Sequence, residues 1–358
     1  MINHVLNSHR GRRIKELVVD MHIYECGNFE KWFEFALAKK AEIIRLCGRL
    51  HDEGPFLRLP ITNGTECLKD LYLGCIKMTD QDFELLISNC LALECLRIRS
   101  SIELQNVSIV GHSKLKHVSL LYVLEVESIV IRDATSLISL AINYLNTRCV
   151  VQLSNIPKLT KLNFEESSNK LLLLDLLIQI PSCIRDQLQL ICLSTTDNSS
   201  SMFSVYMYGE LPWIDLVNIK HLELVLDKGG AAYVRHLTEA CISLEKLVIR
   251  FMDMQREEVM GVNQLDRRYV EGNCELSVKY LEITGYLGFS WQWRLVMYVI
   301  NSATAFQKLT VVCCDQEALA RACHDFQHAP SVHYVTGPIF RTHAELSEYY
   351  RENMWWAD

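Results

Sequence analysis

Few segments of this 358-residue sequence combine residue types and spacing that catalysis would require. GFSWQ, around Ser290, lacks the second glycine of the turn that presents a nucleophilic serine. DKGGAAY does not match a phosphate-binding loop. We therefore expect no catalytic residue and no enzyme activity.

The best candidate for a metal site is CCDQEALARACHDFQH, which covers residues 313–328. On a helix, Cys323 or His324 would share a face with His328, and Cys313 or Cys314 could approach them. This spacing matches no closed zinc site, so we favour a terminal helix that carries ordinary thiols and surface histidines. No metal and no other cofactor is predicted.

Charge and hydropathy narrow the possible partners. The 36 Lys and Arg residues are outnumbered by 43 Asp and Glu residues, a net charge of -7, so a phosphate-binding surface and a nucleic-acid partner are not expected. The most apolar stretch, Leu171 to Ile180, contains Asp175 and is too short to span a bilayer, so no membrane partner is expected. Fourteen scattered cysteines and an N-terminus without an apolar signal core predict reduced thiols and a cytoplasmic or nuclear location, or both.

A recurring phrase shows how the chain is built. CxxLExL occurs at Cys90–Leu96 and again at Cys241–Leu247. The shorter form LxxLxL, with any aliphatic residue or Phe at the marked positions, returns about twelve times along the sequence. The last two apolar residues of each copy are two apart, so they point to the same side of a short strand and are buried together. Parallel stacking of such strands predicts a leucine-rich-repeat solenoid. Its core should contain the middle residue of each triplet, namely Leu96, Leu140, Leu162, Leu222, Leu247 and Leu281.

The spacing between copies predicts what lies on the outer side of the strands. From residue 93 to residue 159 an apolar triplet returns every eleven residues, which indicates a second extended segment in each 22-residue coil. Copies that lie 25 to 34 residues apart leave room for helices, expected at 79–90, 229–241 and 291–303. Cys90 and Cys241 would then be small buried hydrophobic residues at the ends of helices.

The predicted fold is an α/β leucine-rich-repeat solenoid with a parallel inner sheet of about ten to twelve strands, and with helices and some extended segments on the convex side. We expect one solenoid over residues 1–358: an N-terminal cap at 1–50, repeats at 51–312 and a C-terminal cap at 313–358. The aromatic tail EYYRENMWWAD should cover the last coil. The alternative is a peptide contact made by Trp355 and Trp356.

Strand residues that flank the buried positions must face the concave side. They are polar, mixed in sign and different in every coil, as expected of a surface that recognises a specific protein. The predicted partner-binding residues are Tyr72, Arg97, Arg99, His117, Asn143, Lys161, Asn163, His221, Glu223, Lys246, Arg250, Tyr280 and Glu282.

The N-terminal segment HRGRRIKELVVDMH, followed by FEKWFEFALAKKAEIIRL, has a basic strand, a helix with Trp32 and a second strand. Together with IPKLTKLNF and CISLEKLVI, it resembles the leucine-rich-repeat region of plant F-box/LRR proteins, including the group with an FBD-type C-terminal segment. This resemblance implies the substrate-receptor subunit of a cullin-based, SCF-type ubiquitin ligase. Its repeats would hold a protein target, while an F-box would hold the ligase adaptor.

An F-box is a helical segment of about 45 residues that opens with Leu-Pro, and only thirteen residues precede Ile14 here. We therefore expect adaptor binding only if an F-box lies upstream. One alternative is a stand-alone scaffold or decoy that holds targets without a ligase. Another is a small-molecule-sensing receptor that uses the concave face, for which the irregular stretch Thr195–Pro212 is the candidate insertion.

Overall fold

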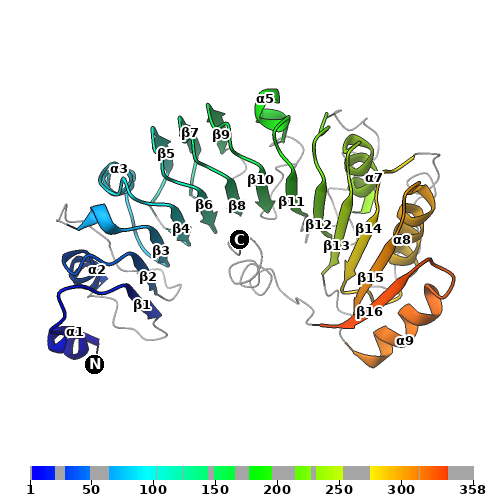
Figure 1. The fold of residues 1–358 in the computed structure, drawn as a ribbon, viewed down its shortest axis with the longest axis horizontal. Coiled ribbons are helices and arrows are strands. Elements are labelled where there is room, and N and C mark those ends of the chain that lie inside the picture. Colours follow the sequence, from blue (N-terminus) through cyan, green and yellow to red (C-terminus); the bar gives the residue numbers. More distant parts are fainter. Residues whose placement is uncertain are drawn as a thin grey trace. The chain divides into compact units, whose positions relative to one another are not determined.

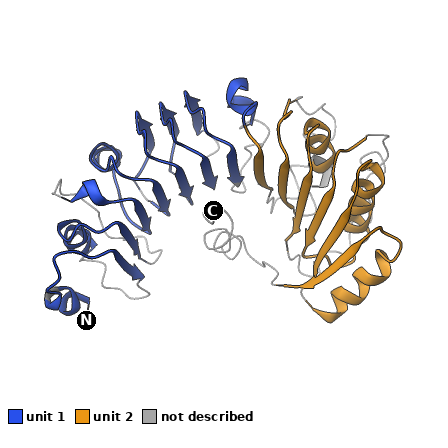
Figure 2. Ribbon diagram, viewed as in Figure 1, with its two compact units in different colours: residues 1–187 blue, residues 188–358 orange. Residues whose placement is uncertain are grey.

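The computed structural model describes residues 2–20, 29–48, 64–101, 103–123, 125–143, 149–165, 177–195, 214–226, 231–252, 275–313 and 315–337. The chain divides into two compact units, residues 1–187 and residues 188–358 (Figure 2).

The first unit contains an inner sheet in which every strand is parallel to its neighbours (Figure 1). Its order, among the described residues, is β1 (Glu16–Asp20), β2 (Ile43–Cys47), β3 (Asp70–Gly74), β4 (Cys95–Arg99), β6 (His117–Leu121), β8 (Ser139–Asn143) and β10 (Lys161–Glu165). The register aligns the repeated triplets, since Leu71 pairs with Leu96, Leu96 with Val118, and Val118 with Leu140. Equivalent apolar residues therefore stack from strand to strand.

The outer side of this unit carries a second, three-stranded parallel sheet. Its strands are β5 (Asn106–Val110), β7 (Ser128–Arg132) and β9 (Val150–Ser154), which confirms the extended segments expected between residues 104 and 153. Helices within its described ranges are α1 (Ile2–Ser8), α2 (Phe29–Ala38), the 3₁₀ turn η2 (Thr65–Cys67), α3 (Asp80–Asn89) and α5 (Ser182–Arg185). Figure 1 shows α2 and α3 on the same side of the inner sheet as the outer strands.

Helix α3 begins with a capping box, in which the Thr79 side chain accepts a hydrogen bond from the backbone of Asp82 and the Asp82 side chain accepts one from the backbone of Thr79. At the next position, Asp80 accepts hydrogen bonds from the backbone N–H groups of Gln105 and Asn106, at 2.7 and 2.8 Å. One short polar sequence thus starts the helix and holds the first outer strand beside it.

The second unit continues the pattern with a parallel sheet and longer helices. Its described strands are β11 (Leu190–Thr195), β12 (His221–Leu226), β13 (Lys246–Phe251), β14 (Tyr280–Thr284), β15 (Lys308–Cys313) and β16 (Val332–Thr336). Its described helices are α7 (Ala231–Ala240), α8 (Ser290–Ser302) and α9 (Gln316–Asp325). The helices expected at 79–90, 229–241 and 291–303 are confirmed as α3, α7 and α8.

The apolar core lies between the inner sheet and the outer elements of each unit. All six leucines predicted at the middle of their triplets are buried to within 1% of complete exclusion from solvent. Cys90 and Cys241 are equally buried, as expected, and burial raises the pKa of each thiol to about 12.

The predicted α/β architecture, with a parallel inner sheet and with helices and extended segments outside it, is confirmed. The cap and repeat boundaries at residues 50 and 312 stay predictions. The aromatic tail with Trp355 and Trp356 lies outside the described residues. None of the helices in the described ranges has the length and apolar character needed to cross a membrane.

Candidate protein-interaction surface

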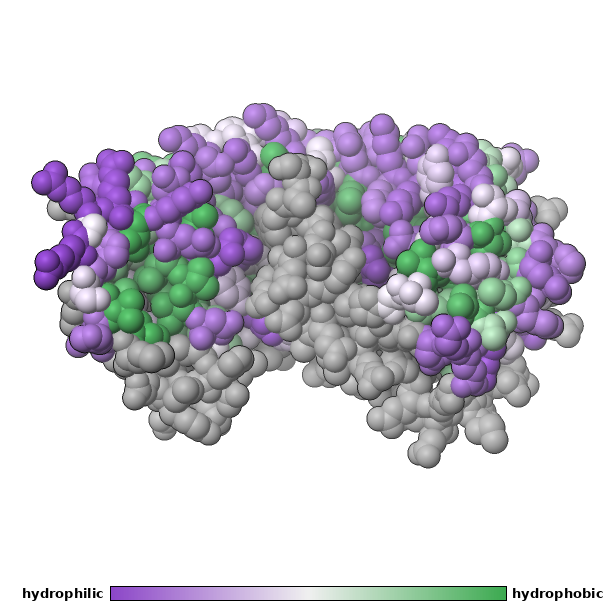
Figure 3. Space-filling view, turned by 60° about the horizontal axis from the view of Figure 1, so that its bottom comes forward, coloured by the Kyte–Doolittle hydropathy of each residue, from purple (hydrophilic) through white to green (hydrophobic). Residues whose placement is uncertain are grey.

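We call the side of each sheet that faces away from the helices and outer strands its inner face. Because side chains alternate along a strand, the residues between the buried positions point to this face. Figure 3 shows that hydrophilic and hydrophobic side chains are mixed on the forward side of the described parts. The thirteen predicted partner-binding residues all lie on inner-face strand positions.

Asp70 on β3 is the centre of an ion cluster on the inner face of the first unit. Its carboxylate accepts hydrogen bonds from Nη2 of Arg97 on β4, at 2.6 and 2.7 Å, and from Nη2 of Arg45 on β2, at 3.3 Å. Arg45 also lies 3.7 Å from Glu16 on β1. Charged side chains therefore link four neighbouring strands; Arg97 is buried in this cluster, whereas Arg45 is partly exposed.

Next to this cluster on the inner face lie Tyr72 of β3 and Arg99 of β4, which aligns with Gly74. The Tyr72 hydroxyl lies 3.7 Å from Sγ of Cys47 on β2, and burial, followed by the neighbouring Cys47, raises the pKa of Tyr72 to about 12. The Arg99 guanidinium lies over the ring of Tyr122, 5.4 Å from its centroid, as in a cation–π contact. This part of the inner face combines a cation, two aromatic rings and a thiol.

Toward residue 165 the inner face of the first unit becomes less charged. A hydrogen bond of 2.9 Å joins Nδ1 of His117 to Oγ of Ser139 on the adjacent strand. Asn143 and Asn163 are buried, whereas Lys161 is half-buried. The half-buried side chains of His117 and Lys161 are therefore the ones that a partner could contact here.

The inner face of the second unit contains a buried ion pair. Glu223 on β12 is 0% exposed and Arg250 on β13 is 7% exposed, and Nε of Arg250 donates a hydrogen bond to the Glu223 carboxylate. Nη1 of Arg250 also donates to the Thr284 hydroxyl on β14, at 3.4 Å. Three strands are thus joined by one guanidinium.

More accessible inner-face side chains lie next to this pair. Nζ of Lys246 is 3.1 Å from the Glu282 carboxylate, and both side chains are partly exposed. His221 is half-buried, and burial, followed by the charge of Lys246, lowers the pKa of its imidazole. Tyr280 is 42% exposed, which makes it the most accessible of the thirteen predicted residues.

Six of the thirteen predicted partner-binding residues are shielded from solvent by their neighbours. Tyr72, Arg97, Asn143, Asn163, Glu223 and Arg250 are buried. Neighbouring strands lie about 4.8 Å apart, so long side chains on adjacent strands pack against one another and form pairs. Charge reversal at Arg97 or Arg250 would therefore disturb folding, and a test of binding has to use the half-exposed positions.

The inner-face residues Arg45 and Cys47 of β2 were not predicted. They flank the triplet Ala41/Ile44/Leu46, whose alanine makes the repeat pattern weak, although all three residues are fully buried. Their place on the inner face could have been inferred from strand alignment, because Arg45 and Cys47 align with Tyr72 and Gly74 on the next strand.

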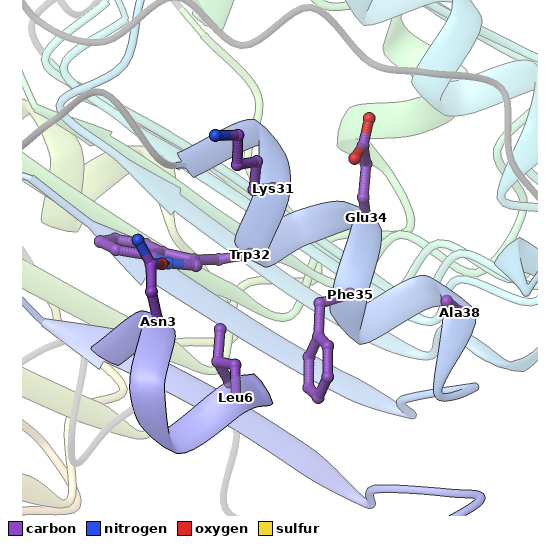
Figure 4. Close-up of a pocket in the computed structure, with 7 residues that line it drawn as sticks. All are labelled: Asn3, Leu6, Lys31, Trp32, Glu34, Phe35 and Ala38. Carbon is purple, nitrogen blue, oxygen red and sulfur yellow. The ribbon is translucent and has the colours of Figure 1, made fainter. Parts of the chain in front are cut away.

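Other parts of the chain are weaker candidates for a functional site. The described residues contain no group of three or more His, Cys, Asp or Glu side chains that could hold a metal ion, and Cys314 lies outside them. A shallow pocket lies between α1 and α2, where Nε1 of Trp32 donates to Oδ1 of Asn3 at 2.7 Å (Figure 4). The stretch proposed as an insertion, Thr195–Pro212, lies outside the described residues apart from Thr195.

The arrangement of parallel inner strands, outer elements and a polar inner face agrees with a comparison to known families. A family model described as "At1g61320/AtMIF1, LRR domain" matches residues 57–341, which is more than half of the chain. The chain belongs to this plant leucine-rich-repeat family. A comparison with curated proteins finds no match.

Membership of the At1g61320/AtMIF1 family identifies the domain as a leucine-rich-repeat domain, a type that typically binds proteins and is typically not enzymatic. In this At1g61320/AtMIF1-type chain the inner face offers charged pairs and aromatic rings that differ from strand to strand. Such variety suits recognition of a particular protein surface.

Proposed function

We propose that this chain is the target-recognition part of an SCF-type F-box ubiquitin-ligase receptor, and that its inner face holds a protein target. The observation that carries the proposal is the chemical variety of that face, which includes the partly exposed pair Lys246–Glu282 and the exposed ring of Tyr280. The ligase role rests on the resemblance of the N-terminal segment to F-box/LRR proteins. A cytoplasmic or nuclear location follows from the same proposal, because cullin-based ligases act there.

A double charge swap tests target binding without removing an ion pair. Lys246→Glu with Glu282→Lys keeps opposite charges 3.1 Å apart but reverses the field that a partner meets. The matched control swaps Lys279 and Glu245, a pair at 3.2 Å formed by the residues that immediately precede β14 and β13. Each swap should leave the circular dichroism spectrum unchanged.

In pull-downs from plant extract, we expect specific partners of the wild-type chain to be lost in the Lys246/Glu282 swap and kept in the control swap. Tyr280→Ala should weaken the same partners, since exposed aromatic residues often carry much of the binding energy. Lys161→Glu probes the first unit in the same way. Retention of every partner by all three variants would contradict binding through the inner face.

The ligase role needs a separate comparison. The chain as given and the chain extended by an F-box segment should hold the same target, whereas only the extended form should bind the ligase adaptor and support ubiquitination of the target. Ubiquitination by neither form, with target binding intact, would favour the scaffold or decoy function. Adaptor binding by the unextended chain would contradict the proposal.

A further inference from the structure

Two cysteines meet where strands β2 and β3 end. Cys47 is the last residue of β2, and its register partner is Gly74, the last residue of β3, which Cys75 follows directly. The backbone is tightly connected here, because the N–H of Gly48 donates to the carbonyl of Gly74 at 3.0 Å. A Cβ atom at Gly74 would lie only 2.8 Å from Sγ of Cys47. The missing side chain therefore makes room for the Cys47 thiol over β3.

The backbone of Cys75 turns its side chain toward β2. Cys75 has φ = 54°, in the left-handed region that few residues other than glycine adopt, and its N–H donates to the carbonyl of Arg99 at 2.8 Å. Its Cβ lies 3.9 Å from the position that a Cβ on Gly48 would take. The register partner of Cys47 is Gly74, about 4.8 Å away across the strands, and Cys75 is the next residue, so a disulfide between the two cysteines is compatible with this backbone.

The surroundings distinguish the two thiols. A hydrogen bond from Cys75, assisted by Tyr72 and by the charge of Arg99, lowers the pKa of Cys47 to about 7, against the effects of burial and of Asp20 on β1. The same hydrogen bond and burial raise the pKa of Cys75. Of the two thiols, Cys47 therefore loses its proton more readily and is the better nucleophile.

We propose that Cys47 and Cys75 form a peroxide-reactive thiol pair that closes to an intramolecular disulfide. The Cys47 thiolate attacks one oxygen of hydrogen peroxide, which breaks the O–O bond, gives a sulfenic acid and releases hydroxide that takes up a proton to form water. The Cys75 sulfur then attacks the Cys47 sulfur, loses its proton and displaces a second water molecule. Two thiols supply the two electrons that reduce the peroxide.

This site stands independently of the proposed ligase function, although it adjoins the inner face. Tyr72 and Arg99, two of the predicted partner-binding residues, are neighbours of the Cys47 thiolate. Disulfide formation removes the negative charge of the Cys47 sulfur that contacts the Tyr72 hydroxyl and lies near Arg99. Oxidation therefore alters the part of the candidate interaction surface that contains Tyr72 and Arg99.

Peptide mapping of the full chain tests the proposal directly. The reduced protein is treated with an equimolar amount of hydrogen peroxide, free thiols are blocked with N-ethylmaleimide, and tryptic peptides are analysed by mass spectrometry. We expect a cross-link between the peptides covering residues 46–49 and 70–77, reversible by dithiothreitol. It should form before the exposed thiols of Cys183 and Cys323 are oxidised.

Single substitutions separate the two roles. With Cys75→Ser, oxidation should stop at a sulfenic acid on Cys47 that dimedone traps, whereas with Cys47→Ser the thiol at Cys75 should stay reduced. Earlier oxidation of Cys183 and Cys323, or a folded wild-type chain that forms no cross-link, would overturn the proposal. Circular dichroism confirms folding of each variant.

The pH dependence of alkylation supplies a readout that does not involve peroxide. The rate at Cys47 should rise with a midpoint near pH 7. Cys75→Ala removes the hydrogen-bond donor and should move the midpoint to higher pH, whereas Cys75→Ser keeps a hydroxyl donor and should move it less. An unchanged midpoint in Cys75→Ala would show that the pair does not activate Cys47.

Discussion

Glu223 and Arg250 lie on neighbouring strands of the second unit, and both are almost completely shielded from solvent. We expect Arg250→Met to lower the free energy of unfolding by about 3 to 5 kcal/mol, because it leaves the Glu223 carboxylate buried without its guanidinium. Urea denaturation measures this loss. Lys246→Met is the matched control on the same strand. Its partner Glu282 is partly exposed, so its loss should be at most about 1 kcal/mol, and equal losses in the two variants would contradict this account.

His112 is a buried imidazole in the first unit, and its two nitrogens contact the backbone. The N–H of Leu115 donates to Nδ1 at 3.2 Å, and Nε2 lies 3.1 Å from the carbonyl of Cys90, so the neutral tautomer with hydrogen on Nε2 satisfies both contacts. Burial lowers the pKa of His112 below its ordinary value of 6.5, despite the opposing backbone hydrogen bonds.

This lowered pKa predicts a loss of stability in mild acid. Below about pH 6.5 the unfolded chain binds a proton that the folded chain accepts only at lower pH, so the free energy of unfolding falls as the pH drops through that window. His112→Asn keeps an acceptor for Leu115 and does not titrate. The fall between about pH 7.5 and about pH 5.5 should therefore be smaller in the variant, as measured by urea denaturation. An identical fall would show that His112 does not contribute.

At the scale of elements, two glycines with similar backbone angles distinguish conformational strain from close packing. Gly285 follows β14 with φ = 75°, and a Cβ there would lie 2.1 Å from the carbonyl oxygen of Phe251 on β13. Gly111 follows β5 with φ = 71°, and a Cβ there would meet no atom within 4 Å. Only Gly285 permits a close approach between neighbouring coils.

Gly111→Ala should therefore lower the free energy of unfolding by only the strain of a left-handed residue, about 1 to 2 kcal/mol. Gly285→Ala should add a backbone collision and exceed that loss by at least about 1 kcal/mol, because β14 would have to shift relative to β13. Thermal and urea unfolding of the two variants provide the comparison. A smaller loss at Gly285 would contradict the close approach.

At the scale of the whole molecule, each unit has its own row of buried leucines. Leu140 in the first unit and Leu247 in the second are fully buried, and truncation of either to alanine should lower the free energy of unfolding by about 2 to 5 kcal/mol. Stacked coils contact mainly their neighbours, so amide hydrogen exchange should accelerate in the truncated unit first. Leu91→Ala is the control, because Leu91 is exposed and its truncation should change little. Uniform acceleration along the chain would contradict a local response.

Much of the fold could be predicted from local pattern. The period-two placement of residues such as Leu96 and Ile98 determines which side of a strand is buried, and the eleven-residue interval determines where outer strands replace helices. The weak triplet that begins at Ala41 shows where prediction from this pattern becomes difficult. Alanine adds little to an apolar pattern, although Ala41 is fully buried in the structure.

The alternation of side chains thus determined from sequence which residues belong to the inner face. Only the tertiary structure decided how accessible each one is, because its neighbours come from strands that are 22 to 34 residues away in the chain. The pairing of Asp70 with Arg97, the burial of Glu223 beside Arg250 and the meeting of Cys47 with Cys75 all depend on register between such strands. Register places distant residues side by side, and it is their packing and pairing there that determines burial, charge and reactivity.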